Sequence, residues 1–197
     1  MGWVCHSTLT AGGARQSAMF GQPHLWSRFT SINQDLKLEC VNAIAVNVAH
    51  AADIGALVAS VHELFQEDGG RHDPFMDTAW PTRDGDAYYA SVVDDPDCLL
   101  LLARDGSTVV GHLVGKLHRA DSIRLAPFAV LESMRVQPQY RGQGVGSLLV
   151  REFFAWARRH RAVQASVTAY AANHRAQSFY VRHGFTAHSV TMRAPEP

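Results

Sequence analysis

Cysteine is scarce in this chain of 197 residues, and the three cysteines, Cys5, Cys40 and Cys98, stand far apart. Their odd number and the lack of a Cys-x-x-Cys pair argue against a disulfide framework and against a cysteine zinc site. The eleven histidines are scattered, and none pairs with another at helical spacing beside an acid, so no metal site is expected. Because a chain without disulfides suits a reducing compartment, we predict a cytoplasmic protein.

Net charge is also absent, because 18 Lys and Arg residues balance 18 Asp and Glu residues. A neutral chain has no basic field to attract nucleic acid or an anionic membrane surface, so neither is expected as a partner. No apolar run approaches the ~20 residues of a membrane helix, and no basic-then-apolar targeting segment is found. Residues 1–40 show neither strand nor helix periodicity. We predict an N-terminal extension there and one folded domain over residues 41–194.

The hydrophobic pattern of that domain predicts both strands and helices. Strands are expected over residues 41–49, 98–103, 109–117, 126–136, 163–170 and 185–192, and helices over residues 54–65, 88–93, 145–160 and 173–183. Gly111 and Gly115 in the third of these strands indicate a bulge or a close backbone approach. Residues 66–86 are polar and acidic and are interrupted by proline, which indicates a loop.

Three glycines, Gly142, Gly144 and Gly146, stand between the fourth strand and an amphipathic helix. Glycines let the backbone approach a ligand closely, and the free N–H groups of a helix's first turn attract anions, so a ligand that carries phosphate is expected. The segment lacks the Gly-Lys-Ser/Thr of a P-loop. It also lacks the Gly-x-Gly-x-x-Gly spacing and the later acid of a dinucleotide site. A glycine-rich turn that only caps a helix is the remaining alternative.

Two blocks decide between these alternatives. Arg141-x-x-Gly144-x-Gly146, which follows Val-x-Pro, resembles the pyrophosphate-binding signature of the GNAT superfamily of N-acetyltransferases. The later block Asn173-x-x-Ala-x-x-x-Tyr180-x-x-x-Gly-Phe resembles a second segment of the same family. The resemblance extends over residues 43–192.

This resemblance implies an α+β fold, with a central mixed, mostly antiparallel sheet, flanking helices and a cleft where the fourth and fifth strands splay apart. Most family members end with two strands after the Gly-Phe pair, whereas this chain has room for one. A homodimer partner that covers the last edge is one way to complete the sheet.

The resemblance also implies acetyl-CoA as the cosubstrate. Its pyrophosphate is expected on the backbone of the glycine loop, where Arg141 either orders the loop or meets phosphate, and its pantetheine arm is expected beside the fourth strand. The residues assigned to acetyl-CoA are Met134, Arg135, Val136, Arg141, Gly142, Gln143, Gly144, Val145, Gly146, Ser147 and Asn173.

For catalysis, the resemblance implies acetyl transfer to a primary amine by direct attack in a ternary complex. Tyr180 matches the family position whose hydroxyl reaches the thioester sulfur. Glu132 is the candidate base, since a carboxylate in the apolar row of Val130, Met134 and Val136 is either functional or paired, for instance with Arg124. The acceptor is expected to be a small-molecule or peptide amine, and the acidic stretch from Glu67 to Asp77 within segment 66–86 favours a cationic one. The alternative is a non-catalytic acyl-CoA sensor or interaction module of the same fold.

Overall fold

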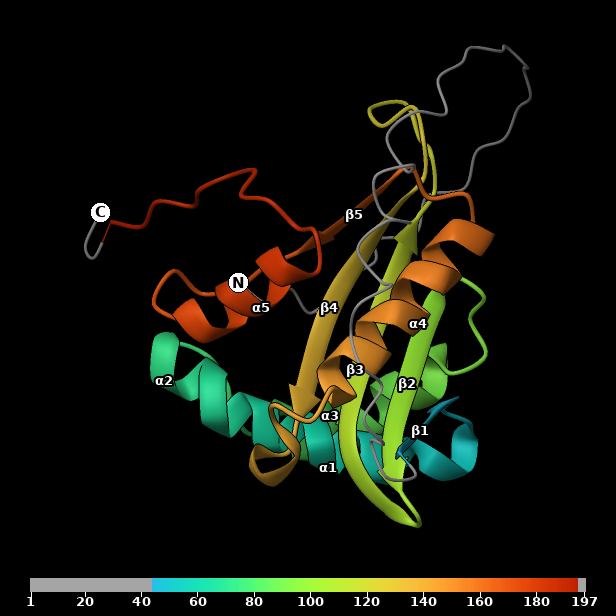
Figure 1. The fold of residues 1–197 in the computed structure, drawn as a ribbon, viewed down its shortest axis with the longest axis vertical. Helices are drawn as coiled ribbons and strands as arrows, with labels where there is room; N and C mark the ends of the chain where they lie inside the picture. The colour runs from blue at the N-terminus through green and yellow to red at the C-terminus, as the bar shows by residue number, and fades with distance from the viewer. Residues whose placement is uncertain (1–43, 195–197) are drawn as a thin grey trace.

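The computed structural model describes residues 44–194 and is built around one five-stranded sheet (Figure 1). Its strands are β1 (Ile44–Val48), β2 (Cys98–Asp105), β3 (Thr108–His118), β4 (Phe128–Val136) and β5 (Gln164–Val167), and they lie side by side in chain order. The first three pairings are antiparallel and the pairing of β4 with β5 is parallel. The predicted mixed, mostly antiparallel sheet is confirmed.

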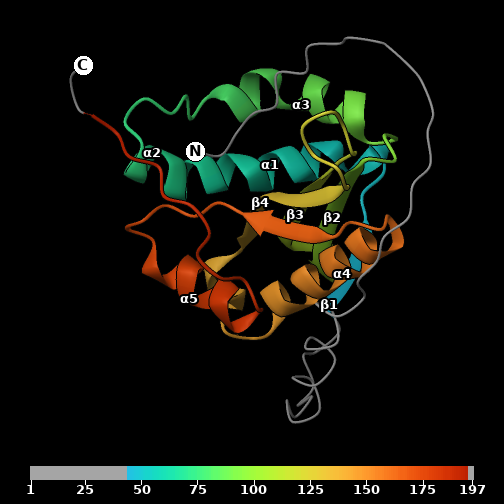
Figure 2. The ribbon, with the colours of Figure 1, turned by 90° about the horizontal axis from the view of Figure 1, so that it is seen from above.

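Helices cover both faces of this sheet (Figure 2). One face carries α1 (Ile54–Leu64) and α3 (Trp80–Val92), which are connected through a π-helical turn (Phe65–Gly69) and the short α2 (Gly70–His72). The other face carries α4 (Val145–Arg159) and α5 (His174–Arg182). Two short 3₁₀ turns, Ala51–Asp53 and Pro138–Tyr140, precede α1 and the glycine loop.

Each face has its own apolar core. Under α4, Leu149 and Phe153 are fully buried against β3, where Gly115 makes room for the Phe153 ring: a Cβ atom at Gly115 would lie 3.0 Å from it. A Cβ atom at Gly111 would lie 2.7 Å from the carbonyl oxygen of Arg135. The prediction of a bulge or a close backbone approach is confirmed: the Arg135 backbone approaches Gly111 closely, and the ladder of β3 and β4 shifts register in a bulge at Val114 and Gly115.

The strand predicted over residues 185–192 is wrong. After Phe185 the chain is irregular up to residue 194, and β5 has no strand on its outer side within the described residues 44–194. A strand forms only where its backbone finds a ladder partner. This segment instead passes beside α5 toward α2, where Arg193 forms an ion pair with Asp73 at 3.0 Å (Figure 2).

The segment between α1 and α3 also differs from the prediction. The helix expected over residues 88–93 begins eight residues earlier, at Trp80, because Pro81 occupies its first turn. Proline suits that position, since the first N–H groups of a helix have no partner inside the helix. As a result, α3 and the π-helical turn hold side chains that a flexible loop would leave free.

Candidate active-site cleft

A cleft opens where β4 and β5 separate. The two strands pair from Phe128 with Gln164 to Leu131 with Val167, and beyond that point β4 continues without its neighbour. The cavity has a volume of about 1420 Å³ and extends from α3 to the N-terminus of α4 and to α5. Typical small-molecule pockets occupy roughly 300–1,000 Å³, so this cleft has room for two ligands at once.

The glycine loop forms one end of the cleft. Gly142 and Gly144 have φ angles of +79° and +84°, in the left-handed region that other residues avoid, and Gly144 is the N-cap of α4. No side chain within the described part of the chain caps this helix end, so the first-turn N–H groups are left for a ligand. Gly146 and Ser147 line the cleft, whereas the Val145 side chain is buried in the core and can offer only its N–H.

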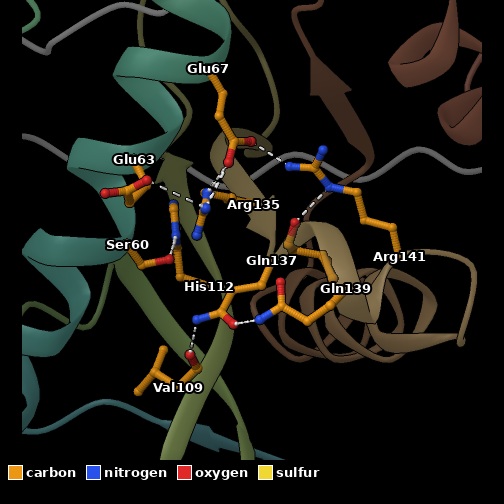
Figure 3. A network of polar contacts seen from close by, with 10 residues as sticks. Ser60, Glu63, Glu67, Val109, His112, Arg135, Gln137, Gln139 and Arg141 are labelled. Atoms are coloured by element: carbon orange, nitrogen blue, oxygen red, sulfur yellow. Dashed lines mark hydrogen bonds and ion pairs between the residues drawn. The ribbon is translucent and has the colours of Figure 1, made fainter.

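Arg141 holds the loop in place. Its Nε donates a hydrogen bond of 2.7 Å to the Val136 carbonyl, and its Nη2 donates to the Glu67 carboxylate (Figure 3). The side chain therefore ties the loop both to the end of β4 and to the π-helical turn. Of the two roles considered for Arg141, ordering of the loop is the one that these contacts support.

Glu67 also binds Arg135, whose side chain lies on the α1 face of the sheet and is 7% exposed (Figure 3). The Arg135 guanidinium donates to Glu67 Oε1 from Nε at 3.1 Å and from Nη2 at 2.6 Å, and Glu63 lies farther away, at 3.8 Å. Burial alone would raise the pKa of the Glu67 carboxyl, but the hydrogen bonds from Arg135 and Arg141 hold that pKa below its usual value. Glu67 thus stays ionised between two arginines.

Beside this pair, His112 of β3 is fully buried and bridges two serines. Its Nδ1 lies 2.7 Å from Ser60 Oγ of α1, and its Nε2 lies 3.0 Å from Ser133 Oγ of β4. Burial and the charge of Arg135 lower the pKa of His112 to about 3, so the ring is neutral at physiological pH. The three side chains fix α1 and β4 at the level of the cleft.

Glu132 lies at the point where β4 and β5 separate, but it does not share a face with Met134 and Val136. Gly115 pairs with Leu131 and Val114 pairs with Ser133, which leaves Glu132 as an extra residue in a β-bulge. The bulge shifts the alternation by one position. Met134 and Val136 pack against the α4 core, while Glu132 lies on the α1 and α3 face, so the predicted shared row is wrong.

The environment of Glu132 is apolar rather than ionic. Burial raises the pKa of its carboxyl, and the nearby charge of Lys116 opposes this only in part. Within the described residues Glu132 has no ion pair or hydrogen bond, and Arg124 stacks on the Phe128 ring instead, at 4.3 Å from its centroid. The alternative of a structural pair with Arg124 is therefore wrong.

The predicted face of α5 does line the cleft. Asn173 is the N-cap of α5: its Oδ1 accepts from the Ala176 N–H at 3.0 Å, while its Nδ2 donates to Asp68 at 2.8 Å. Seven residues on, Tyr180 packs its ring against Phe179 and Phe185 and presents its side chain to the cleft. Burial raises the pKa of the Tyr180 hydroxyl, which therefore keeps its proton.

The cleft contains further residues that the sequence did not assign to acetyl-CoA or to catalysis. These are Glu67, Asp68, the aromatic residues Phe65, Trp80, Tyr88 and Tyr89, and His183, whose Nε2 lies 3.0 Å from Ser147 Oγ. All but His183 come from the segment between α1 and α3 or from α3 itself. Nothing in the local spacing of these residues indicates which strand they face. The acidic character of the segment between α1 and α3 was the only signal in the sequence. No cluster of potential metal ligands and no helix able to cross a membrane is found among residues 44–194.

Solved structures with the same fold include several bacterial proteins. A point mutant of the Bacillus halodurans BH1408 protein superposes with a TM-score of 0.68 at 17% identity, covering 77% of this chain and 98% of its own. A Clostridium acetobutylicum protein described as a predicted acetyltransferase and solved with acetyl-CoA gives 0.63 at 13% identity, covering 77% and 95%. The aminoglycoside 6'-N-acetyltransferase AAC(6')-Ih of Acinetobacter baumannii gives 0.60 at 16% identity, covering 78% and 98%. At such identities the likeness shows the fold alone.

The sequence itself gives the family. The profile of the acetyltransferase (GNAT) family matches residues 58–185, which include β4, the glycine loop, α4 and α5. A search of curated protein sequences gave no significant match. The chain therefore belongs to the acetyltransferase (GNAT) family and is an acyltransferase whose cosubstrate is acetyl-CoA.

Proposed function

We propose that this protein transfers the acetyl group of acetyl-CoA to a primary amine of a small molecule, by direct attack within a ternary complex. The observation that carries the proposal is the arrangement around the splayed strands. A helix N-terminus suited to phosphate stands at one end of the cleft, and a half-buried carboxylate and a protonated tyrosine line it. The volume of the cleft admits cosubstrate and acceptor together.

In this proposal each residue of the cleft has a separate role. The backbone of Gly142–Ser147 holds pyrophosphate, and Arg141 orders the loop through the Val136 carbonyl. The edge of β4 from Met134 to the Val136 N–H, which lies beyond the pairing with β5, binds the pantetheine amides. Glu132 takes a proton from the acceptor ammonium, and the amine nitrogen then attacks the thioester carbon. As the C–S bond breaks, Tyr180 donates its hydroxyl proton to the departing sulfur. The nitrogen loses its second proton as the amide forms, and that proton restores the Tyr180 hydroxyl.

Acetyl-CoA binding can be tested by thermal denaturation, because a ligand of the folded state raises the melting temperature by mass action. Gly144→Glu is expected to abolish that rise, since it places bulk and negative charge where phosphate binds. Gly106→Glu is the matched control: Gly106 also has a positive φ angle, of +57°, and open space around its Cα, but it lies in the turn between β2 and β3. An acetyl-CoA shift that survives in Gly144→Glu would refute the loop assignment.

Turnover is tested by release of free coenzyme A thiol in the presence of amines. Wild-type protein is expected to release thiol only when an amine and acetyl-CoA are both present. Bound acetyl-CoA with no release in the presence of any amine would contradict the proposed reaction and favour an acyl-CoA sensor.

A further inference from the structure

Four aromatic rings form a continuous wall on the α3 side of the cleft. Phe65 stacks on Trp80 with centroids 6.0 Å apart, Trp80 meets Tyr88 edge-on at 5.6 Å, and Tyr88 meets Tyr89 at 5.1 Å. All four line the cleft, and they come from the π-helical turn and from α3. Mutual packing holds the rings in fixed positions, so this wall is a preformed apolar surface.

One carboxylate accompanies the wall. Glu132 lines the same cleft as these rings, and its charge raises the pKa of the Tyr89 hydroxyl after the larger effects of burial and of Tyr88. Lys116 compensates the charge of Glu132 only in part, and Glu132 forms no ion pair within residues 44–194. The aromatic wall and Glu132 therefore offer a cation one ionic contact and several ring faces or edges.

The other acids near the cleft are already engaged. Glu67 is held by Arg135 and Arg141, and Asp68 contacts the Asn173 amide and His72. Three further acids also have partners: Asp73 pairs with Arg193, Asp77 pairs with Arg83, and Asp105 accepts from the Tyr140 hydroxyl. Arginines thus pair with Glu67, Asp73 and Asp77, whereas Asp68 and Asp105 keep their negative charge and are hydrogen-bonded to the Asn173 amide and the Tyr140 hydroxyl. A second ammonium group of a polycation would have to compete with these internal contacts, whereas the ammonium group of a monoamine meets an unpaired carboxylate at Glu132.

We infer that the acceptor is a monoamine carried on an aromatic or similarly flat apolar group, and not a polycation such as an aminoglycoside or a polyamine. This inference rests on the proposed function and names its substrate class. The apolar group packs against Trp80 and Tyr88, and the single ammonium group approaches Glu132, which also removes its proton. Packing on the rings contributes apolar burial and cation–π attraction while the amine is charged.

The first test compares acceptors at equal concentration in the coenzyme A release assay. Phenylethylamine and tryptamine represent the proposed class, and kanamycin and spermidine represent polycations. We expect kcat/KM to be at least about tenfold higher for the aromatic monoamines, the factor that 1.4 kcal/mol of extra transition-state stabilisation gives. Faster turnover of kanamycin or spermidine would overturn the inference and leave the proposed function intact. Failure of every amine would refute both.

The second test asks whether the wall binds the acceptor. Trp80→Ala is expected to raise the KM for phenylethylamine about tenfold or more while the KM for acetyl-CoA stays unchanged. Phe75→Ala is the control, because Phe75 belongs to the same segment but is 92% exposed and lies outside the cleft. Tyr88→Ala supplies a second variant, and an unchanged acetyl-CoA thermal shift verifies that each variant is folded. Equal KM values for the Trp80, Tyr88 and Phe75 variants would contradict the inference.

Discussion

At the scale of single residues, the clearest expectation concerns Glu132. Glu132→Gln keeps the size of the side chain but cannot accept a proton, so turnover near neutral pH is expected to fall on the order of a hundredfold. The deficit should shrink as pH rises, because the acceptor then loses its proton to solvent. Glu63→Gln is the control, because Glu63 is an exposed carboxylate on α1. A fully active Glu132→Gln enzyme in steady-state assays would remove Glu132 from the mechanism.

The same substitution has a consequence for stability. Burial raises the pKa of Glu132 in the folded protein, so the folded state favours the protonated carboxyl. That contribution is fully present below the pKa of the unfolded chain and is lost as pH rises through the folded pKa. Glu132→Gln is therefore expected to melt at a higher temperature than wild type at neutral pH, and the difference should vanish below about pH 4. A lower melting temperature at neutral pH would show that Glu132 is paired.

A conservative substitution tests the role of the Tyr180 hydroxyl. Tyr180→Phe removes one hydroxyl and keeps the ring that packs against Phe179 and Phe185. We expect kcat to fall roughly ten- to a thousandfold, the range of general acid catalysis, with little change in the affinity for acetyl-CoA. Tyr140→Phe is a control, because the Tyr140 hydroxyl donates a hydrogen bond to Asp105 at 3.0 Å and has no role in the proposed reaction. If acetyl-CoA affinity collapses in Tyr180→Phe while kcat is normal, Tyr180 binds the cosubstrate and is not the acid.

At the scale of elements, Glu67 joins the π-helical turn to β4 and to the glycine loop. Glu67→Ala leaves the buried Arg135 with only the more distant Glu63 carboxylate as a counterion and is expected to lower the free energy of unfolding by about 3 kcal/mol. Glu63→Ala is expected to cost less than about 1 kcal/mol, because its side chain is 57% exposed and lies 3.8 Å from the same guanidinium. Urea denaturation of both variants measures the difference. Equal losses would show that Arg135 does not depend on Glu67.

At the scale of the whole molecule, residues 44–194 contain the sheet, its helices and every residue proposed for the site. Removal of residues 1–40 is therefore expected to leave the acetyl-CoA thermal shift and the turnover of amines unchanged. The predicted extension lies outside the described residues, so this truncation is the direct test of the domain boundary. Loss of the thermal shift in the truncated protein would assign part of the binding site to the extension.

Local sequence was sufficient for several features of the site. Glycines before an amphipathic helix predict left-handed turn positions and a helix start, and the structure has both at Gly142 and Gly144, because conformation and helix end are local properties. Phosphate binding by this loop stays a prediction. The spacing of Asn173, Ala176 and Tyr180 fixes their common face for the same reason, and all three line the cleft. The splay of β4 and β5 came from the family resemblance and is confirmed by the pairing that ends at Leu131 and Val167.

Tertiary structure decided the remainder. Alternation placed Glu132 with Met134, but the register shift opposite Gly115 moved it to the other face, and no local pattern reveals which residue a ladder leaves unpaired. The partners of Glu67 lie 68 and 74 residues away, so a carboxylate that looked available to ligands was already paired with two arginines. The last predicted strand failed for a related reason, since a strand depends on a neighbour as well as on its own sequence.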